Sequence, residues 1–300
     1  MSDSSEKLIL TGAAGLLGQA ILNKFRSHYD LVAVINKTEI DDPPEDIEIV
    51  QADLSVKKAV SELIDKHKPD IILNAAAWVD VDGCESDRKR ALKSNFSVVE
   101  NIVNAIKDKR IYLVQISTDY IFNGVDHPAN VDDSPAPLNY YGRTKFMAEE
   151  CIVDNYARYL ITRTCALLGS PNRGQTNLIN YFYNSLKEGK EVQAPEDIYA
   201  NPIWVENLSE LLLEAIQKGY KGMLHLGGKD YLSRYEFARI FADVFGFDES
   251  LIKPVAAIHQ RRPAKRPQYA GLNVNQTRDK FETPLLTARE ALTEIRKNIE

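Results

Sequence analysis

Three side chains near the middle of the chain have the types and the spacing for a proton transfer. Tyr141 and Lys145 lie four positions apart in a segment with a helical pattern from about Tyr140, so both would occupy one helical face. Thr118 follows residues 111–116, an apolar segment too short for a helix and rich in β-forming residues. Its hydroxyl would stand at the carboxyl end of a strand, where open α/β sheets bind ligands. We therefore predict that Thr118 orients a carbonyl oxygen beside Tyr141.

A lysine beside a tyrosine would make the phenol a stronger acid. A free phenol titrates near ~10 and a lysine ammonium near ~10.4. An ammonium roughly 4 Å away, at an effective dielectric of about 20, would lower the pKa of Tyr141 by ~3 units. Tyr140 is five positions from Lys145 and is therefore rotated by roughly 140° from it. Spacing thus selects Tyr141 as the proton donor, although Tyr-x-x-x-Lys alone also fits an ordinary amphipathic helix.

A glycine-rich turn near the amino terminus predicts a dinucleotide site. The apolar segment 8–10 leads into a Gly-x-x-Gly-x-x-Gly pattern, and a helix is predicted from there to about residue 25. Glycines in a strand–turn–helix allow backbone N–H groups to approach a pyrophosphate, and the helix amino end adds partial positive charge. The alternative is a glycine-rich turn without a ligand. The predicted contacts are Gly12, Gly15, Leu16, Leu17 and Gly18.

The ends of the following strands complete the predicted cofactor site. The second strand, 31–35, ends in Asn36 and Lys37, not in an acid that would bind the ribose hydroxyls and repel a 2′-phosphate. This favours NADPH, with NADH as the alternative, while Lys37 as a solvated loop residue fits equally well. Two further strands end in residues that would line a flat cofactor: Asp53, Leu54, Ala75, Ala76 and Ala77.

The alternation of strands and helices predicts an α/β fold, a doubly wound parallel sheet with helices on both faces. We expect residues 1–170 to form the cofactor-binding domain. Residues 171–300 would form a smaller α/β substrate lobe, with the chain crossing between the two. A long helix is expected over residues 84–107, where Asn95 interrupts the apolar face either as a buried polar link to the active-site strands or without special role.

Composition excludes several classes of function. The 300 residues are 44% hydrophobic and 27% charged, as is usual for soluble globular proteins. A net charge of −6 offers no general attraction to nucleic acid or to anionic membranes. No apolar run approaches ~18 residues and residues 1–7 are polar, so neither a membrane span nor a secretory signal is expected. Three scattered cysteines predict a reducing, cytoplasmic setting without a disulfide framework or a zinc site.

These motifs fall in an order that resembles the extended short-chain dehydrogenases/reductases. Within that superfamily, three segments are similar to the dTDP-4-dehydrorhamnose reductase family. They are Asn-Ala-Ala-Ala-x-x-x-Val-Asp-x-Cys-Glu from Asn74, Ser-Thr-Asp-Tyr-Ile-Phe-Asn-Gly from Ser117, and Pro-Leu-Asn-x-Tyr-Gly-x-x-Lys from Pro137. The likeness is specific from residue 7 to about 170 and looser beyond. Ala166 stands where the family usually has a tryptophan beside the sugar, which leaves the sugar open.

The resemblance implies that NADPH reduces a nucleotide-linked 4-keto-6-deoxysugar. In that family pattern Thr118 and Asp119 contact the substrate, Tyr141 donates the proton, and Lys145 holds the nicotinamide ribose and tunes Tyr141. The expected partner is the nucleotide sugar, with a homodimer left open. Two alternatives share the signatures. One is the non-enzymatic, NADP-binding regulatory β-subunit of methionine adenosyltransferase, and the other is a nucleotide-sugar epimerase or a reductase of other specificity.

Charged groups outside these motifs yield weaker expectations. The basic segment 259–267 fits a nucleic-acid patch, a solvated loop, or a loop that meets a nucleotide diphosphate. In an acidic chain we favour the last and assign Arg266 to substrate binding, because arginine forks match phosphate. His225 has no acid or nucleophile spaced to pair with it, so packing is expected. Asp80 and its acidic neighbours match no calcium loop, and no metal site is predicted.

Overall fold

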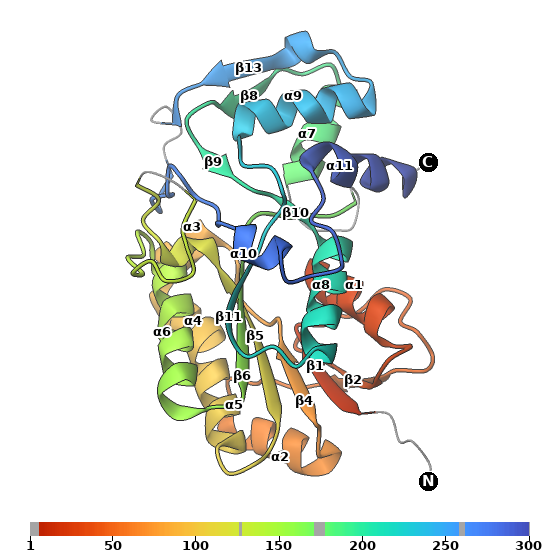
Figure 1. Cartoon of the computed structure of the whole chain (residues 1–300), viewed down its shortest axis with the longest axis vertical. Coiled ribbons are helices and arrows are strands. Elements are labelled where there is room, and N and C mark those ends of the chain that lie inside the picture. Colours follow the sequence, from red (N-terminus) through yellow and green to blue (C-terminus); the bar gives the residue numbers. More distant parts are fainter. Residues whose placement is uncertain (1–5, 126–127, 171–177, 258–261, 300) are drawn as a thin grey trace.

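A seven-stranded parallel sheet forms the centre of the protein (Figure 1). The computed structural model describes residues 6–125, 128–170, 178–257 and 262–299. The sheet has the order β11-β6-β5-β4-β1-β2-β3. The chain first adds β2 and β3 on one side of β1 and then crosses to add β4, β5, β6 and β11 on the other side, as in doubly wound folds. The predicted fold class is therefore confirmed. In chain order the strands are β1 (Lys7–Thr11), β2 (Asp30–Ile35), β3 (Glu48–Gln51), β4 (Ile71–Asn74), β5 (Tyr112–Thr118), β6 (Tyr159–Thr164) and β11 (Gly222–Leu226).

Alternating side chains of the strands build two apolar layers. In β1, Leu8 and Leu10 belong to one hydrophobic cluster, while Ile9 between them belongs to the other. Successive strand residues point to opposite faces, so a continuous apolar segment is buried on both sides of the sheet. Helices cover both faces: α1 (Leu16–Phe25) and α8 (Val205–Gln217) on one, and α2 (Lys57–His67), α5 (Val98–Ile106) and α6 (Tyr140–Asn155) on the other.

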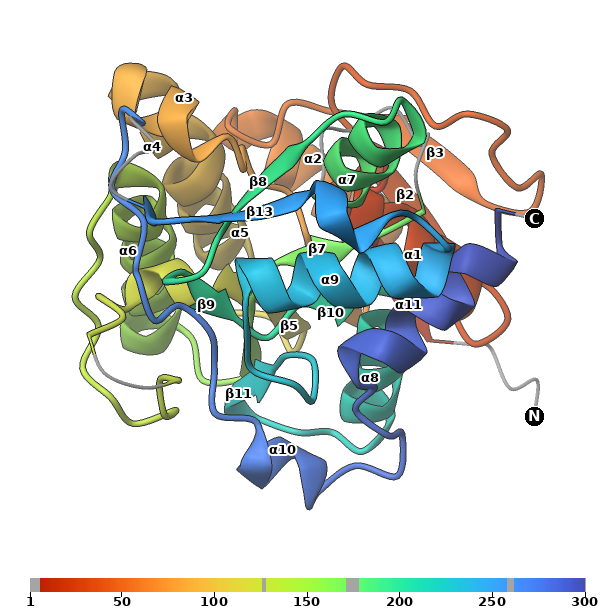
Figure 2. The same ribbon diagram turned by 90° about the horizontal axis from the view of Figure 1, so that it is seen from above.

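A smaller lobe faces one end of the sheet (Figure 1). Its core contains Phe182, Phe237 and Phe241, and helices α9 and α11 pack against each other across the top of the molecule (Figure 2). Its elements are α7 (Leu178–Lys187), β8 (Val192–Pro195), β9 (Tyr199–Ala200), β12 (Leu232–Ser233), α9 (Arg234–Phe245), the 3-10 turn η3 (Glu249–Leu251), β13 (Ile252–Val255) and α11 (Ala288–Lys297). Short elements connect it to the sheet: β7 (Leu167–Leu168), β10 (Ile203–Trp204) and α10 (Asn275–Arg278).

The chain returns to the sheet after it has entered the smaller lobe. Strand β11 pairs in parallel with β6 at the sheet edge, and α8 packs against α1. We therefore propose that residues 205–226 belong with the cofactor-binding domain, so that residue 170 marks only where the chain first leaves the sheet. Within the described part of the chain, none of the helices has the length and hydropathy needed to cross a bilayer.

The helix predicted over residues 84–107 is present from Arg88 to Ile106, but its predicted start is wrong, because a separate short helix ends at Ser86. The structure has α3 (Val81–Ser86), α4 (Arg88–Leu92), the π-helical turn η1 (Lys93–Ser97) and then α5. The carboxylate of Asp87 accepts a hydrogen bond from the backbone N–H of Arg90 at 3.0 Å, which starts a new helix inside the predicted one. Asp80 caps α3 in the same way through Gly83 N. Asp80 and Asp87 thus serve as helix caps, and the hydrogen bond of Asp87 explains the break between α3 and α4.

Candidate active site

The glycine loop forms a cradle that excludes side chains. Gly12 has a φ of +69°, and a Cβ there would lie 2.7 Å from the backbone N of Ala76. A Cβ at Gly18 would lie 2.2 Å from the carbonyl oxygen of Gly12, and Gly15 N donates to that oxygen at 2.9 Å. The structure therefore brings the predicted loop against the predicted alanine segment. Helix α1 begins after Gly15 without a side-chain cap, which is the arrangement that suits a phosphate.

The other predicted residues of this half are placed in different ways. The side chain of Leu17 is buried in the core between α1 and α8, so only its backbone faces the loop. Leu16 packs against Gly169. Asn36 and Lys37 are exposed at the end of β2. Ala77 follows Ala76 at the end of β4 and is partly buried.

At the tip of β3, Asp53 is exposed and Leu54 is buried. The hydroxyl and the backbone N–H of Ser55 both donate to the Asp53 carboxylate, and these bonds hold the pKa of Asp53 below its ordinary value. The Lys93 ammonium lies 3.3 Å from the same carboxylate. Asn101 Nδ2 donates to the carbonyl of Leu54 at 3.0 Å, so this strand tip is fixed to α5.

Three buried polar side chains that the sequence analysis did not single out form hydrogen bonds across strands β1, β4 and β5. The hydroxyl of Thr11 on β1 donates to Asn74 Oδ1 on β4. Asn74 Nδ2 in turn donates to Gln115 Oε1 on β5 at 2.7 Å. The three side chains are at most 1% exposed, so each hydrogen bond forms in a medium that strengthens it. These hydrogen bonds hold the glycine loop, the alanine segment and the Thr118 strand in register at the carboxyl edge of the sheet.

The predicted catalytic residues come together at this edge. Thr118 is the last residue of β5, and its side chain hydrogen-bonds with the phenol of Tyr141. The Thr118 hydroxyl donates to Asp119 Oδ1 at 3.1 Å. Lys145 is buried, and its ammonium donates to the carbonyl of Ile116 at 2.7 Å. The Tyr140 ring lies instead beneath the Arg88 guanidinium, whose Cζ is 5.0 Å from the ring centre.

The expected lowering of the Tyr141 pKa by Lys145 is wrong for this structure. Burial is the largest influence, and it raises the pKa of the Tyr141 phenol above its ordinary value, while the hydrogen bond with Thr118 partly opposes this. Burial also lowers the pKa of Lys145 to about 8, and the Glu149 carboxylate opposes that change. The Lys145 ammonium donates instead to a backbone carbonyl of β5.

Helix α6 is held at its first turn by two asparagines. Asn139 caps it by accepting from Gly142 N at 2.9 Å. Asn95, on the π-helical turn, donates to the Thr144 hydroxyl at 3.2 Å and accepts from Trp78 N at 2.7 Å. Because it is 1% exposed and ties α6 to the segment after β4, Asn95 is the buried polar link, the first of the two alternatives drawn from the sequence.

The two predicted substrate contacts lie in different surroundings. Asp119 is 4% exposed, accepts from Gly271 N at 3.1 Å, and has its pKa raised to about 6 by burial. Arg266 instead forms a two-pronged ion pair with Asp82, with both N–O distances 2.8 Å, and this pairing lowers the pKa of Asp82. Asp119 therefore joins Thr118 and Tyr141, whereas Arg266 joins α3. Residues 259–261 of the basic segment lie outside the described residues.

His225 is packed, as expected. Its ring lies edge-on to Phe122 with 5.9 Å between centroids, and Nε2 is 3.5 Å from Arg163 Nη1. Burial and the arginine lower the pKa of His225 to about 3, so the imidazole is neutral at ordinary pH. The neutral, enclosed imidazole fits the packing role that the sequence predicts.

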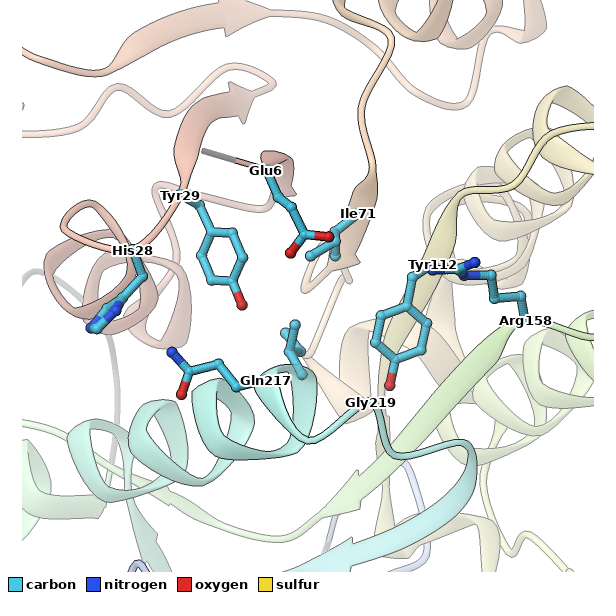
Figure 3. Close-up of a pocket in the computed structure, with 9 residues that line it drawn as sticks. Glu6, His28, Tyr29, Ile71, Tyr112, Arg158, Gln217 and Gly219 are labelled. Atoms are coloured by element: carbon cyan, nitrogen blue, oxygen red, sulfur yellow. The ribbon is translucent and has the colours of Figure 1, made fainter. Parts of the chain in front are cut away.

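A cavity of about 440 Å³ lies at the opposite end of the sheet (Figure 3). Glu6, Tyr29, Tyr112 and Gln217 are among the residues that line it, and they come from the amino ends of strands and the end of α8. The glycine loop and Thr118 lie at the carboxyl ends, where doubly wound sheets bind ligands. We therefore assign the cofactor to the carboxyl edge and not to this cavity.

Comparison with known proteins finds relatives over almost the whole chain. A family model described as RmlD substrate binding domain matches residues 6–300. The dTDP-4-dehydrorhamnose reductase of Mycobacterium tuberculosis is 29% identical over 300 residues, covering 97% of this chain and 93% of that protein. A solved structure of dTDP-4-dehydrorhamnose reductase from Bacillus anthracis in complex with NADP has a TM-score of 0.86 and 25% identity, covering 98% of this chain and 99% of that one.

A relative of another kind is also similar. Methionine adenosyltransferase 2 subunit beta of Rattus norvegicus is 26% identical over 258 residues, covering 84% of this chain and 75% of that protein. Both kinds of protein that the sequence motifs resemble are thus found among the relatives.

Proposed function

Because the chain belongs to the family described as RmlD substrate binding domain, we propose that it is an NADPH-dependent reductase of a nucleotide-linked 4-keto-6-deoxysugar. The observation that supports this most directly is the meeting of Thr118 and Tyr141 at the edge of the sheet that also holds the glycine loop. The names of the reductase relatives supply the substrate class. The loop from Gly12 to Gly18 suits a dinucleotide because its glycines let it pack closely against Ala76, and because α1 begins without a side-chain cap, which leaves N–H groups of the helix start for phosphate.

Each residue of the proposed site has a task that its surroundings suit. When bound, NADPH supplies the hydride. The Thr118 hydroxyl orients the substrate carbonyl, and Tyr141 donates a proton to the oxygen that becomes a hydroxyl. A reduction needs the phenol in its protonated form, and burial favours that form of Tyr141 at neutral pH. Lys145 holds the nicotinamide ribose, and the glycine loop with Asp53, Leu54 and the alanine segment holds the remainder of the cofactor.

The substrate contacts follow from the same arrangement. We propose that Asp119 contacts the sugar and that Arg266 contacts the diphosphate. Two N–H groups of Arg266, Nε and one on Nη2, are not used by Asp82 or by the Ala264 carbonyl. They are available for phosphate oxygens, which arginine binds with charge-assisted hydrogen bonds.

Three finer assignments belong to the same proposal. Preference for NADPH over NADH rests on Asn36 and Lys37, and a cytoplasmic location on three free cysteines in a reducing compartment. A homodimer is a further proposal, to be examined by sedimentation of the purified protein. The second candidate function is a regulatory subunit without turnover, favoured by the similarity to methionine adenosyltransferase 2 subunit beta.

The test is turnover of 4-keto nucleotide sugars. Purified protein is incubated with NADPH and a panel of these sugars, and the loss of cofactor absorbance is followed. Tyr141→Phe should lower turnover by about 10²–10⁴, the usual contribution of a positioned general acid, while NADPH affinity is kept. Tyr140→Phe is the matched control on the same helical turn and should cost much less.

Full activity of Tyr141→Phe would falsify the assignment of the proton donor. A protein that binds NADPH, reduces none of the sugars, and associates with a methionine adenosyltransferase would replace the reductase with the regulatory function.

A further inference from the structure

A buried ion pair lies one helical turn behind Lys145. Glu149 on α6 and Arg163 on β6 have side chains that are 2% and 3% exposed. Arg163 Nη2 lies 2.8 Å from Glu149 Oε2, and Arg163 Nε lies 3.2 Å from both carboxylate oxygens. Two charges removed from water at this depth need several partners to remain favourable. The pair has such partners in the Ser117 hydroxyl, the Val131 carbonyl, the Met223 sulfur and the His225 ring.

The carboxylate side of the pair is attached to the catalytic strand. The hydroxyl of Ser117, which directly precedes Thr118, donates to Glu149 Oε1. Lys145 donates to the carbonyl of Ile116 on the same strand. Lys145 and Glu149 are four residues apart on α6 and thus share one helical face. The end of β5 therefore donates one hydrogen bond to Glu149, from the Ser117 hydroxyl, and accepts another from the Lys145 ammonium, and both partners lie on helix α6.

The arginine side of the pair is attached to the loops that enclose the substrate region. Arg163 Nη1 donates to the carbonyl of Val131 at 2.9 Å. The loop containing Val131 pairs with the segment around Gly271: Ala129 N donates to the Gly271 carbonyl at 3.0 Å. Gly271 N in turn donates to Asp119. Hydrogen bonds joined by short stretches of backbone thus connect Glu149, through Arg163, to the carboxylate beside Thr118.

The charges around Lys145 single out Glu149. Burial of Lys145 disfavours its charged form, and Glu149 is the carboxylate that acts in the opposite direction. On α6, Tyr141 is neutral because burial raises its pKa. On β11, His225 faces Arg163 and is also neutral at working pH. Asp119, beyond Thr118 at the end of β5, acts on Tyr141 and not on Lys145.

We propose that Glu149 is a positioning residue, whose carboxylate, fixed by Arg163 and Ser117, keeps Lys145 charged and directed at the carboxyl end of β5. The inference rests on the proposed function for the task of Lys145, which is to hold the nicotinamide ribose. It predicts that cofactor binding depends on a charge that itself never touches cofactor or substrate.

The experiment measures the dissociation constant of NADPH by fluorescence titration between about pH 6.5 and 10. Lys145 has its pKa lowered to about 8. In the wild-type protein the affinity for NADPH should therefore fall as the pH rises through 8 and Lys145 loses its proton. In Glu149→Gln the midpoint of this fall should move to lower pH by about one unit, as expected when a nearby opposite charge is removed. Glu149→Asp keeps the charge and should restore most of the wild-type midpoint.

Two further variants separate positioning from folding. Glu149→Gln leaves Arg163 buried without its carboxylate, so Glu149→Gln/Arg163→Gln removes both charges and keeps two groups that can hydrogen-bond to each other. Its midpoint should also move down, because Glu149 and not Arg163 acts on Lys145. Glu150→Gln, the neighbouring exposed residue on α6, is the matched control and should bind NADPH as the wild type does.

Unchanged midpoints in the folded double variant would overturn the proposal, as would a wild-type affinity that stays constant from pH 7 to 9. A shift in the midpoint without turnover of any keto sugar would keep Glu149 as a positioning residue and reject the reductase. Turnover of a keto sugar with unshifted midpoints would keep the reductase and reject Glu149 as a positioning residue. Absence of NADPH binding at every pH would reject both.

Discussion

The glycine loop, residues 11–18, and the basic loop, residues 262–267, are both predicted to meet phosphate groups, and they differ in which atoms do so. The glycine loop presents backbone N–H groups in a cradle from which every side chain is excluded by contacts under 3 Å at Gly12 and Gly18. The basic loop presents the side chain of Arg266, and the structure commits part of that guanidinium to Asp82.

Backbone sites and side-chain sites therefore differ in how far they can be inferred from a pattern. A strand–turn–helix with three glycines specifies its own conformation, because the residues that define it are neighbours in sequence. An arginine acquires its role from whatever lies opposite in space, and Asp82 stands 184 positions from Arg266. Three changes would break or sharpen this contrast.

The largest effect is expected at the glycine loop. Gly12→Ala places a Cβ 2.7 Å from Ala76 N in a backbone conformation with φ +69°, so the loop must shift. We expect NADPH affinity to fall by at least about 100-fold, or roughly 2.7 kcal/mol, in a fluorescence titration. Gly189→Ala is the matched control, because its φ is +67° and a Cβ there meets nothing within 4 Å. Equal losses in both variants would show that backbone strain alone, and not the cradle, is responsible.

A tenfold effect is expected at the basic loop. Arg266→Gln should raise KM for the nucleotide sugar about 10-fold, since a charge-assisted hydrogen bond contributes about 1.5–3 kcal/mol. Asp82→Asn keeps the arginine and an acceptor oxygen, so its KM should rise less than about 3-fold. Steady-state kinetics on the two variants decides between direct and indirect action. If both raise KM equally, Arg266 acts through its pairing with Asp82 and the diphosphate contact is lost from the proposal.

The smallest effect is expected at the exposed end of β2. Lys37→Glu should reduce the preference for NADPH over NADH, because a carboxylate there repels the 2′-phosphate. The expected change is only about fivefold, since solvent and salt screen a charge at this exposed position. The ratio of the two dissociation constants at low and at high salt is the measurement. A wild-type protein that binds both cofactors equally well would remove the basis of this prediction.

The parts of the fold that could be predicted are those with local causes. The strand ending at Thr118, the helix beginning at Tyr140 and the turn around Gly12 all follow from short patterns of residue types. Their meeting at one edge follows from the parallel sheet, because parallel strands end on the same side. The spacing of Tyr141 and Lys145 predicts Tyr141 and not Tyr140 as the proton donor, and the structure places the Tyr140 ring under Arg88.

The remainder depends on partners that sequence spacing does not reveal. Burial sets the pKa of Tyr141, and burial is a property of the assembled site. The Glu149–Arg163 pair joins a helix to a strand, and neither residue has a local pattern that marks it as buried. The helix expected over residues 84–107 is interrupted at Asp87, because its carboxylate accepts a hydrogen bond from the backbone N–H of Arg90. A periodic apolar pattern does not reveal this hydrogen bond.

The position of β11 at the sheet edge has a consequence for the order of events during synthesis. Until the ribosome has released Gly222–Leu226, β6 remains an open edge with unpaired backbone groups, and α1 lacks the cover of α8. A chain shortened after residue 170 would keep both features permanently and should aggregate. The sheet is thus completed only when most of the chain has been made.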